Sequence, residues 1–287
     1  GIISSVHKGK LVKVQGDPDH FGTRGFLCNK VTNYPERVYS QDRLLHPIKR
    51  VGKKGTGTFE RITWEEALET VSQQFHEIIS RNGGESILPF SGSGTLGLVN
   101  GTVAGKRFFN RLGASRLDRT ICSKGGRIGY KYTLGASFGA DPFAIPQSKL
   151  IISWGTNPYS TNIHQIPLIQ EARRNGARYV VVNPYKVKSA DMANLFLQPT
   201  PGSDAALALG VMHIIINNSL YDKEFVEKYT EGFEALSKRV QEYPPEKVEE
   251  ITEVKKDVLV EFAKMYASHS PSFIYAGSGM QHHTNGG

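Results

Sequence analysis

The sequence predicts an α/β protein, a doubly wound and mostly parallel sheet domain preceded by a small β-rich lobe. Three observations support this fold class. Residues 150–153 form a short apolar run rich in β-branched side chains, which is typical of a buried strand. Apolar residues then recur at helical spacing over residues 163–172, and a second apolar run occupies residues 179–182. Strand, helix and strand in this order make a βαβ unit, whose crossover is almost always right-handed.

The turn after the first of these strands is a candidate binding site. In parallel α/β folds, ligands bind at the carboxyl ends of strands, where helix N-termini direct free N–H groups outward. Trp154, Gly155 and Asn157 stand at this position. Gly155 lets a ligand approach the backbone closely, and Asn157 adds an amide. A plain strand-to-helix turn, with Asn157 and Pro158 starting the helix, explains the same residues.

Composition excludes several classes of protein. The chain has 287 residues, of which 39% are hydrophobic, and a formal net charge of +8. Because Lys and Arg are scattered rather than gathered in a stripe, we expect an anionic cofactor and no nucleic acid. No apolar run approaches the length of a membrane span. The two cysteines, Cys28 and Cys122, argue against a disulfide scaffold, and we expect a cytoplasmic protein. The first residue is Gly1 rather than Met, which predicts a fragment.

Residues 1–50 are expected to form the small lobe. Two strands, over residues 2–7 and 11–15, flank a turn at Gly9, which is a hairpin signal. A loop rich in Gly, Asp and Pro follows.

That loop leads to Cys28, which stands two residues before Lys30. A single cysteine is by default a small buried apolar residue. The basic and turn-rich residues 43–54 are expected to be a linker. We expect a second domain over residues 51–287.

The clearest helix spans residues 63–81. Thr63 and Glu66 form the pattern of a capping box, and Gly83 follows the end of the helix. The residues on one face are apolar, which indicates a structural helix: Trp64, Ala67, Leu68, Val71, Phe75, Ile78 and Ile79.

Residues 86–90 are expected to form a strand that leads into residues 92–97, which read G-S-G-T-L-G. This is a G-x-G-x-x-G pattern ahead of a helix over residues 99–112. Asp118 follows at about the distance expected for a contact with a ribose hydroxyl. The pattern is that of an NAD-dependent dehydrogenase. Since the chain holds 30 glycines, chance matches are common, and this function remains an alternative.

Cys122 stands at the expected start of another helix, with Lys124 and Arg127 close in sequence. A helix N-terminus and neighbouring cations favour a thiolate. A thiolate is either a nucleophile or a ligand for a soft metal. No histidine base stands at a suitable spacing, which favours the metal. A buried structural cysteine is the alternative.

A buried helix, apolar nearly all round, is expected from Asp204 to about residue 218, directly after Gly202. A carboxylate in a first helical turn usually interacts only with the helix dipole. It can also accept two N–H bonds from a guanine edge.

The C-terminal part predicts two amphipathic helices, over residues 223–229 and 255–266, and a last strand over residues 273–275. A glycine-rich segment with two adjacent histidines follows. Adjacent side chains point in different directions on most backbones, so we do not expect a metal site at His282 and His283.

Together these segments resemble the molybdopterin oxidoreductases of the dimethyl sulfoxide reductase superfamily, specifically the N-terminal part of the large catalytic subunit in the formate-dehydrogenase-like branch. The resemblance covers essentially the whole chain. Its specificity comes from the order and spacing of several segments: residues 25–30, 42–52, 62–67, 154–158, 182–184, 201–207 and 277–287.

The resemblance implies two cofactors. Cys28 is similar to the fourth cysteine ligand of a four-iron four-sulfur cluster. Cys122 is similar to the residue that binds molybdenum or tungsten in bis(molybdopterin guanine dinucleotide), and is the implied catalytic residue. The implied contacts with the pterin cofactor are Lys30, Trp154, Gly155, Asn157, Asn183, Pro184, Gly202, Asp204, Gly279, Met280 and Gln281.

The implied activity is a two-electron redox reaction of a small-molecule substrate, in a bacterial or archaeal enzyme that exchanges electrons with a redox partner. Ser123 stands where formate dehydrogenases carry histidine, and Asn183 replaces a frequent aspartate, which does not favour formate as the substrate. The other three cluster cysteines would precede Gly1, and later domains would complete the pterin site. We therefore expect this fragment to hold neither cofactor and to be inactive. A non-catalytic α/β binding module is a further alternative.

Overall fold

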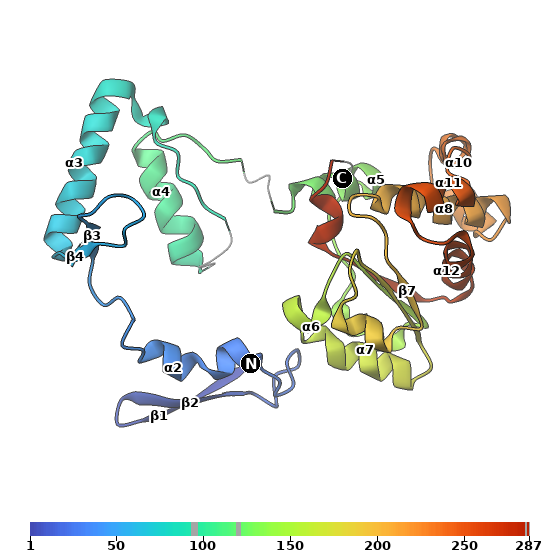
Figure 1. The fold of residues 1–287 in the computed structure, drawn as a ribbon, viewed down its shortest axis with the longest axis horizontal. Coiled ribbons are helices and arrows are strands. Elements are labelled where there is room, and N and C mark those ends of the chain that lie inside the picture. Colours follow the sequence, from blue (N-terminus) through green and yellow to red (C-terminus); the bar gives the residue numbers. More distant parts are fainter. Residues whose placement is uncertain (93–96, 119–121, 285, 287) are drawn as a thin grey trace. The chain divides into compact units, whose positions relative to one another are not determined.

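A computed structural model describes residues 1–92, 97–118, 122–284 and 286. The chain divides into two compact units, Gly1–Arg119 and Thr120–Gly287 (Figure 1).

The N-terminal unit begins with the predicted hairpin. Strand β1 (Ile2–His7) pairs antiparallel with β2 (Lys10–Gly16). Two short helices follow, α1 (Asn29–Thr32) and α2 (Tyr34–Val38). The prediction of a small β-rich lobe at the start of the chain is confirmed.

The segment expected to be a linker instead contains half of a second hairpin. Strand β3 (Ile48–Arg50) pairs antiparallel with β4 (Phe59–Arg61). Three consecutive residue pairs form this ladder. The residues of β3 are exposed, so part of the basic segment 43–54 is an exposed strand rather than an unstructured connection.

Helix α3 (Trp64–Asn82) confirms the clearest helical prediction. The Thr63 hydroxyl accepts a hydrogen bond from the Glu66 N–H at 3.1 Å, which caps the helix. The Glu66 carboxylate contacts Lys49 Nζ at 3.5 Å, so the structure shows one half of the predicted capping box. The apolar face is largely exposed in this unit, with Trp64 62% exposed, while Phe75 contacts Phe108 at a ring-centroid distance of 6.4 Å.

The strand expected over residues 86–90 is not formed, and that prediction is wrong. Residues of η1 (Gly84–Ser86) form a 3-10 turn, and the Ile87 carbonyl accepts one hydrogen bond, from the Ser115 N–H at 2.9 Å. A strand needs a neighbouring backbone along its length, and one contact does not make a ladder.

Residues 93–96 of the glycine pattern lie outside the described residues. After them come η2 (Leu98–Val103), a π-helix, and α4 (Ala104–Arg111). A dinucleotide fingerprint requires a strand before the glycines and a regular helix after them. No strand precedes the glycines in the described flanks, and the turns directly after them are π-helical, so the nicotinamide alternative is not favoured.

The C-terminal unit is built on a parallel sheet of four strands in the order β7-β6-β5-β8. The strands are β5 (Leu150–Trp154), β6 (Arg178–Val182), β7 (Leu195–Leu197) and β8 (Ser272–Ala276). The helices of this unit are α5 (Lys124–Leu134), η3 (Pro142–Gln147), α6 (Pro158–Thr161), α7 (Gln165–Arg174), η4 (Lys188–Met192), α8 (Asp204–Asn217), α9 (Lys223–Tyr229), α10 (Phe233–Val240), α11 (Pro245–Thr252), α12 (Lys256–Ser268) and η5 (Ser278–Gln281).

Helices cover both faces of this sheet. Leu150 and Ile152 of β5 pack with α8, α11 and α12, whereas Ile151 packs with α7 on the opposite face. Because side chains alternate between the faces of a strand, both faces of β5 are buried, and its residues are apolar except for Ser153. The predicted doubly wound parallel sheet is confirmed.

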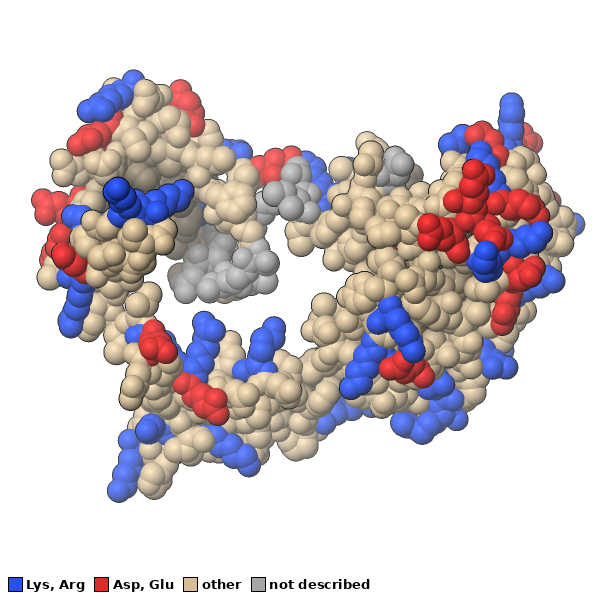
Figure 2. Space-filling view, viewed as in Figure 1, with Lys and Arg blue, Asp and Glu red and all other residues tan. Residues whose placement is uncertain are grey.

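The helical surface of the C-terminal unit mixes charges of both signs. On the face shown in Figure 2, Lys and Arg are interspersed with Asp and Glu over this region. Contacts such as Arg239–Glu242 at 2.7 Å and Lys255–Glu249 at 2.8 Å illustrate the mixing. None of the helices in the described part of the chain has the length and apolar character needed to cross a membrane.

The predicted helices of this unit are confirmed as α7, α8, α9 and α12, and α5 begins after Cys122 as expected, whereas α10 and α11 were not predicted. Helix α8 is only partly buried along its circumference, and Met212 is 39% exposed. Its closest packing is at Gly210, where a Cβ atom would lie 2.7 Å from Val248 Cγ2.

We predict that Gly210→Ala destabilises the C-terminal unit. At an unobstructed helix position this change stabilises by about 1 kcal/mol, but overpacking typically costs about 1–3 kcal/mol. Gly105→Ala in α4 is the matched control, because no atom of the described residues outside its own helical turn lies within 4 Å of its Cβ position. Urea unfolding followed by circular dichroism measures both variants. Val248→Ala should relieve the loss in Gly210→Ala, and a stabilised Gly210→Ala would contradict the packing.

Candidate functional site

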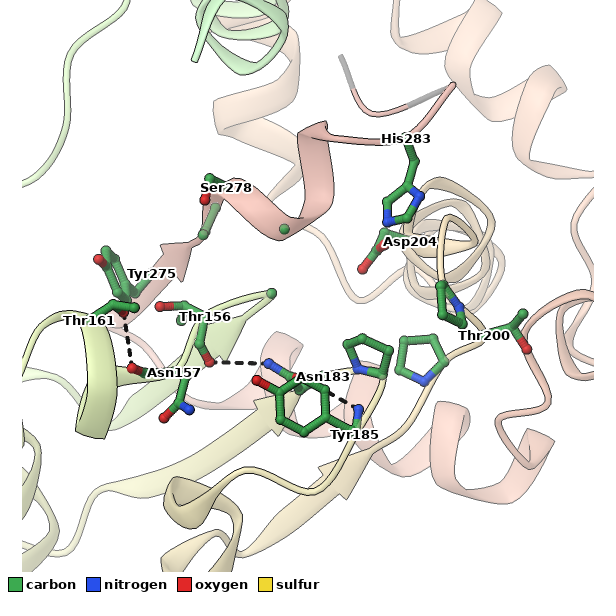
Figure 3. A pocket seen from close by; sticks show the side chains of 17 residues that line it. Thr156, Asn157, Thr161, Asn183, Tyr185, Thr200, Asp204, Tyr275, Ser278 and His283 are labelled. Atoms are coloured by element: carbon green, nitrogen blue, oxygen red, sulfur yellow. Dashed lines mark hydrogen bonds between the residues drawn. The ribbon is translucent and has the colours of Figure 1, made fainter. Parts of the chain in front are cut away.

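The carboxyl ends of the four parallel strands open onto one cavity of about 490 Å³ (Figure 3). Gly155 follows β5, Asn183 follows β6, Thr200 follows β7 and Gly277 follows β8, and all four residues line the cavity. The chain runs from β5 to β6 and β7 on one side and returns to β8 on the other side of β5. The cavity therefore lies at the topological switch point, where ligands bind in open parallel sheets.

Two glycine turns meet at this point. The Gly277 N–H donates to the Trp154 carbonyl at 2.7 Å, which extends the pairing of β8 with β5 into the turns. A Cβ atom on Gly277 would overlap the Gly155 carbonyl oxygen, and one on Gly279 would lie 2.9 Å from it. Gly155 itself has φ of +62°, which favours glycine. The wall of the cavity is thus bare backbone that a ligand can approach.

Asp204 and Trp154 are linked at the edge of this cavity. Trp154 Nε1 donates to Asp204 Oδ1 at 2.7 Å. The indole ring is buried and packs edge-on against Phe262 at a centroid distance of 6.0 Å. Asp204 lies in the first turn of α8 and lines the cavity. Its second oxygen accepts no hydrogen bond from a described residue, so the carboxylate combines a structural contact with a free acceptor.

The two asparagines differ in their partners. Asn183 Nδ2 donates to the Thr156 carbonyl at 3.3 Å, and its Oδ1 accepts from the Tyr185 N–H at 3.4 Å (Figure 3). Asn183 thereby ties the turns after β5 and β6. Asn157 Oδ1 is buried and accepts no hydrogen bond from any described residue. A buried acceptor without a donor is costly, and a ligand N–H or O–H in the cavity would satisfy it.

His283 forms the wall opposite these turns. A Cβ atom on Gly202 would lie 3.3 Å from its ring, and the ring points toward Asp204 (Figure 3). An imidazole and a carboxylate therefore border the same end of the cavity, where both can bond to a polar heterocycle.

One buried hydroxyl supports the sheet beneath the site. Tyr179 of β6 donates to Ser153 Oγ at 2.9 Å. Burial raises the pKa of the Tyr179 phenol, while the hydrogen bond to Ser153 acts in the opposite direction. The phenol remains neutral around neutral pH and acts as a fixed donor.

Cys122 is an exposed free thiol two residues before α5. Its carbonyl oxygen lies 2.9 Å from His282 Nε2. The Gly126 N–H, in the first turn of α5, donates to Gln281 Oε1 at 2.7 Å. The loop of Cys122 is therefore fastened to the segment that follows β8.

The structure brings most of the sequence-predicted residues of this unit together. Six of them line the cavity: Gly155, Asn157, Asn183, Pro184, Asp204 and Gly279. Trp154 and Gly202 support lining residues through the contacts above. Met280 packs against the core on the face of α8 and lies over Gly155, and Gln281 contacts α5.

Cys28 and Lys30 belong to the N-terminal unit. Cys28 is a half-buried free thiol at the start of α1, where its carbonyl oxygen accepts from the Thr32 hydroxyl at 3.2 Å. Lys30 is exposed on α1.

Sequence reasoning missed several residues that line the cavity. All of them lie near the end of a strand or on the segment that follows it, and this position could have identified them from the sequence. They are Thr156, Thr161, Tyr185, Pro199, Thr200, Tyr275, Ser278 and His283.

These features fit a polar heterocycle joined to phosphates. Bare backbone at the glycine turns accommodates bulky anionic groups, and the first turn of α8 faces the cavity. The free acceptor of Asp204 suits the N–H donors of a purine edge. In the described part of the chain no three His, Cys, Asp or Glu side chains gather in a way that could hold a metal ion.

Comparison with known proteins gives concordant family matches. The molybdopterin oxidoreductase family matches residues 43–287, and the molybdopterin oxidoreductase Fe4S4 domain matches residues 1–40. The chain is 49% identical to the probable oxidoreductase YoaE of Bacillus subtilis (strain 168), over 100% of this chain and 42% of the relative.

Two further relatives carry specific names. The chain is 35% identical to acetylene hydratase of Syntrophotalea acetylenica, over 86% of this chain and 34% of the relative. It is 32% identical to dimethyl sulfoxide reductase DmsA of Escherichia coli (strain K12), over 94% of this chain and 37% of the relative.

Among solved structures, acetylene hydratase from Pelobacter acetylenicus matches with a TM-score of 0.81 and 33% identity, over 99% of this chain and 39% of that chain. The chain thus spans less than half the length of the relatives it matches.

We predict that Asp204→Ala lowers the free energy of unfolding by about 2 kcal/mol, because it leaves the buried Trp154 N–H without its acceptor. Asp204→Asn keeps an acceptor oxygen and should cost less than about 1 kcal/mol. Urea unfolding followed by Trp154 emission, in a Trp64→Phe background, measures both.

Asp257→Ala is the matched control, since Asp257 lies in the first turn of α12. An equal loss for Asp204→Ala and Asp257→Ala would show that the bond to the indole contributes nothing and that Asp204 acts only on the helix dipole.

Proposed function

Because the chain belongs to the molybdopterin oxidoreductase family, we propose that it supplies part of the cofactor-binding structure of a molybdenum or tungsten oxidoreductase. The observation that carries this proposal is the cavity at the switch point. Four strand ends, two bare glycine turns and an unsatisfied buried acceptor meet there. Such a cavity suits one guanine dinucleotide arm of bis(molybdopterin guanine dinucleotide).

The guanine, the pyrophosphate and the metal of this cofactor each have candidate residues in the chain. Asp204 would bind the guanine edge through its free oxygen, and the turns at Gly155 and Gly279 would lie against the pyrophosphate. His283 would close the nucleotide end of the cavity. When bound, the cofactor supplies two-electron redox chemistry at its metal. Cys122 would tie that metal to the protein through its thiolate.

The N-terminal unit would serve electron transfer. We assign Cys28 as one thiolate ligand of a four-iron four-sulfur cluster, which the Fe4S4 domain match over residues 1–40 supports. Lys30, exposed and two residues away, would place a positive charge beside the electron path. We propose residues 1–50 as the iron–sulfur lobe and residues 51–287 as the pterin-binding domain. Limited proteolysis in the segment between α2 and β3 tests this division, because β3 and β4 pair in one hairpin.

Substrate and partners are proposed only by class. The relatives with specific names are named for acetylene hydration and for dimethyl sulfoxide reduction, so the shared feature is a small-molecule substrate. We propose a protein redox partner that exchanges electrons through the cluster.

We propose the cytoplasm as the location, and cell fractionation tests it. The formate-dehydrogenase-like branch stays a prediction, which substrate screening would check.

The proposal predicts opposite effects of two cysteine substitutions in a full-length subunit that carries this chain. Cys28→Ala should lose the four-iron cluster, because the cluster needs four thiolate ligands, while molybdenum or tungsten is retained. Cys122→Ala should retain iron but lose turnover and change the electron paramagnetic resonance spectrum of the metal. Elemental analysis and that resonance measure both variants. An unchanged cluster signal in Cys28→Ala would refute the iron–sulfur assignment.

If Asp204 binds the guanine, a substitution at Asp204 should lower the amount of bound nucleotide while the protein remains folded. Asp204→Asn in the same subunit should lower the guanine nucleotide released by acid denaturation, since one carboxylate acceptor becomes an amide donor. Asp257→Asn serves as the control, since Asp257 also lies in the first turn of a helix, α12. If Asp204→Asn retains as much guanine nucleotide as Asp257→Asn, Asp204 does not bind the guanine.

A further inference from the structure

The segment after β8 contacts both the cavity and the backbone at the start of α5. Ser278, Gly279 and His283 line the cavity. Gln281 and His282, between them, contact the loop of Cys122 instead. A turn of six residues therefore touches both the proposed nucleotide site and the proposed metal ligand.

Gln281 replaces a missing helix cap. The N-cap residue of α5 is Ser123, and its side chain makes no capping hydrogen bond. The Gly126 N–H, which an N-cap side chain normally satisfies, donates to Gln281 Oε1 at 2.7 Å, 155 residues away in sequence. A Cβ atom on Gly126 would lie 2.9 Å from that oxygen, so glycine leaves the room for this cap.

The start of α5 depends on such outside support. Its first turn contains Gly125 and Gly126, which have low helix propensity. Cys122 is exposed, and its backbone carbonyl is bound by His282 at 2.9 Å. The two contacts from one turn thus hold the backbone on both sides of Ser123.

We propose that Gln281 and His282 are positioning residues that fix the Cys122 thiol relative to the cofactor cavity. Because the same turn lines the cavity, an occupant that contacts Ser278, Gly279 or His283 also restricts the loop of Cys122. The role of Cys122 as a metal ligand rests on the proposed function, whereas the positioning itself does not.

A nitroxide attached to Cys122 tests this in the 287-residue chain, in a Cys28→Ser background that leaves a single thiol. Gln281→Ala and His282→Ala should each give a more mobile nitroxide spectrum. Gln281→Ala should also speed hydrogen exchange at the Gly126 amide by about fivefold, the effect of losing a typical cap. Conservative variants should restore the restricted spectrum, Gln281→Glu by keeping an acceptor and His282→Gln by keeping a donor.

His213→Ala is the matched control, because His213 Nδ1 also lies 2.9 Å from a backbone carbonyl, that of Val240. An unchanged spectrum in both alanine variants would overturn the proposal. So would an equal change in His213→Ala, or a failure of the conservative variants to restore the signal. No metal takes part in this measurement, so its failure is separate from a failure of the proposed cofactor assignment.

Discussion

The contact between the turns after β5 and β8 is the constraint on which the site depends. The backbone at Gly277 reaches the Gly155 carbonyl so closely that no side chain fits between them. This contact places the segment after β8 across the mouth of the sheet, next to α8. Without it, Gly279 and His283 would not border the same cavity as Asp204. A short-range steric requirement for two glycines thus determines the position of groups far apart in sequence.

The polar residues around the cavity use some of their atoms for hydrogen bonds within the chain and leave others available to a ligand. Asp204 holds the indole of Trp154 with one oxygen and presents the other to the cavity. Asn183 uses both ends of its amide to join two turns. Asn157 leaves its buried oxygen unpaired. Preorganised acceptors of this kind need little rearrangement on binding, which lowers the cost of recognition. The ligand then completes hydrogen bonds that the folded chain leaves open.

The sequence predicted those features that depend on local pattern. The apolar runs of β5 and β6, the helix between them and the turn at Gly155 follow from periodicity and glycine placement. The expected strand over residues 86–90 failed because a strand also requires a partner, which the described residues do not provide. His283 and Thr200 could not be assigned to the cavity in advance, because their placement depends on β8 pairing with β5 and β7 with β6. Strand order is a property of the whole unit rather than of any segment.

At Cys122, too, the local sequence predicted one feature, whereas another depends on residues far away in the sequence. Its sequence neighbourhood predicted a helix start, and α5 begins there. The neighbourhood did not predict how that start is held, since Ser123 provides no cap and Gln281 does. The first turn of α5 is weak in itself because of its two glycines, and its geometry is set by a turn that also lines the cavity. The thiol and the cavity therefore share one support, so a change in the segment after β8 acts on both sites together.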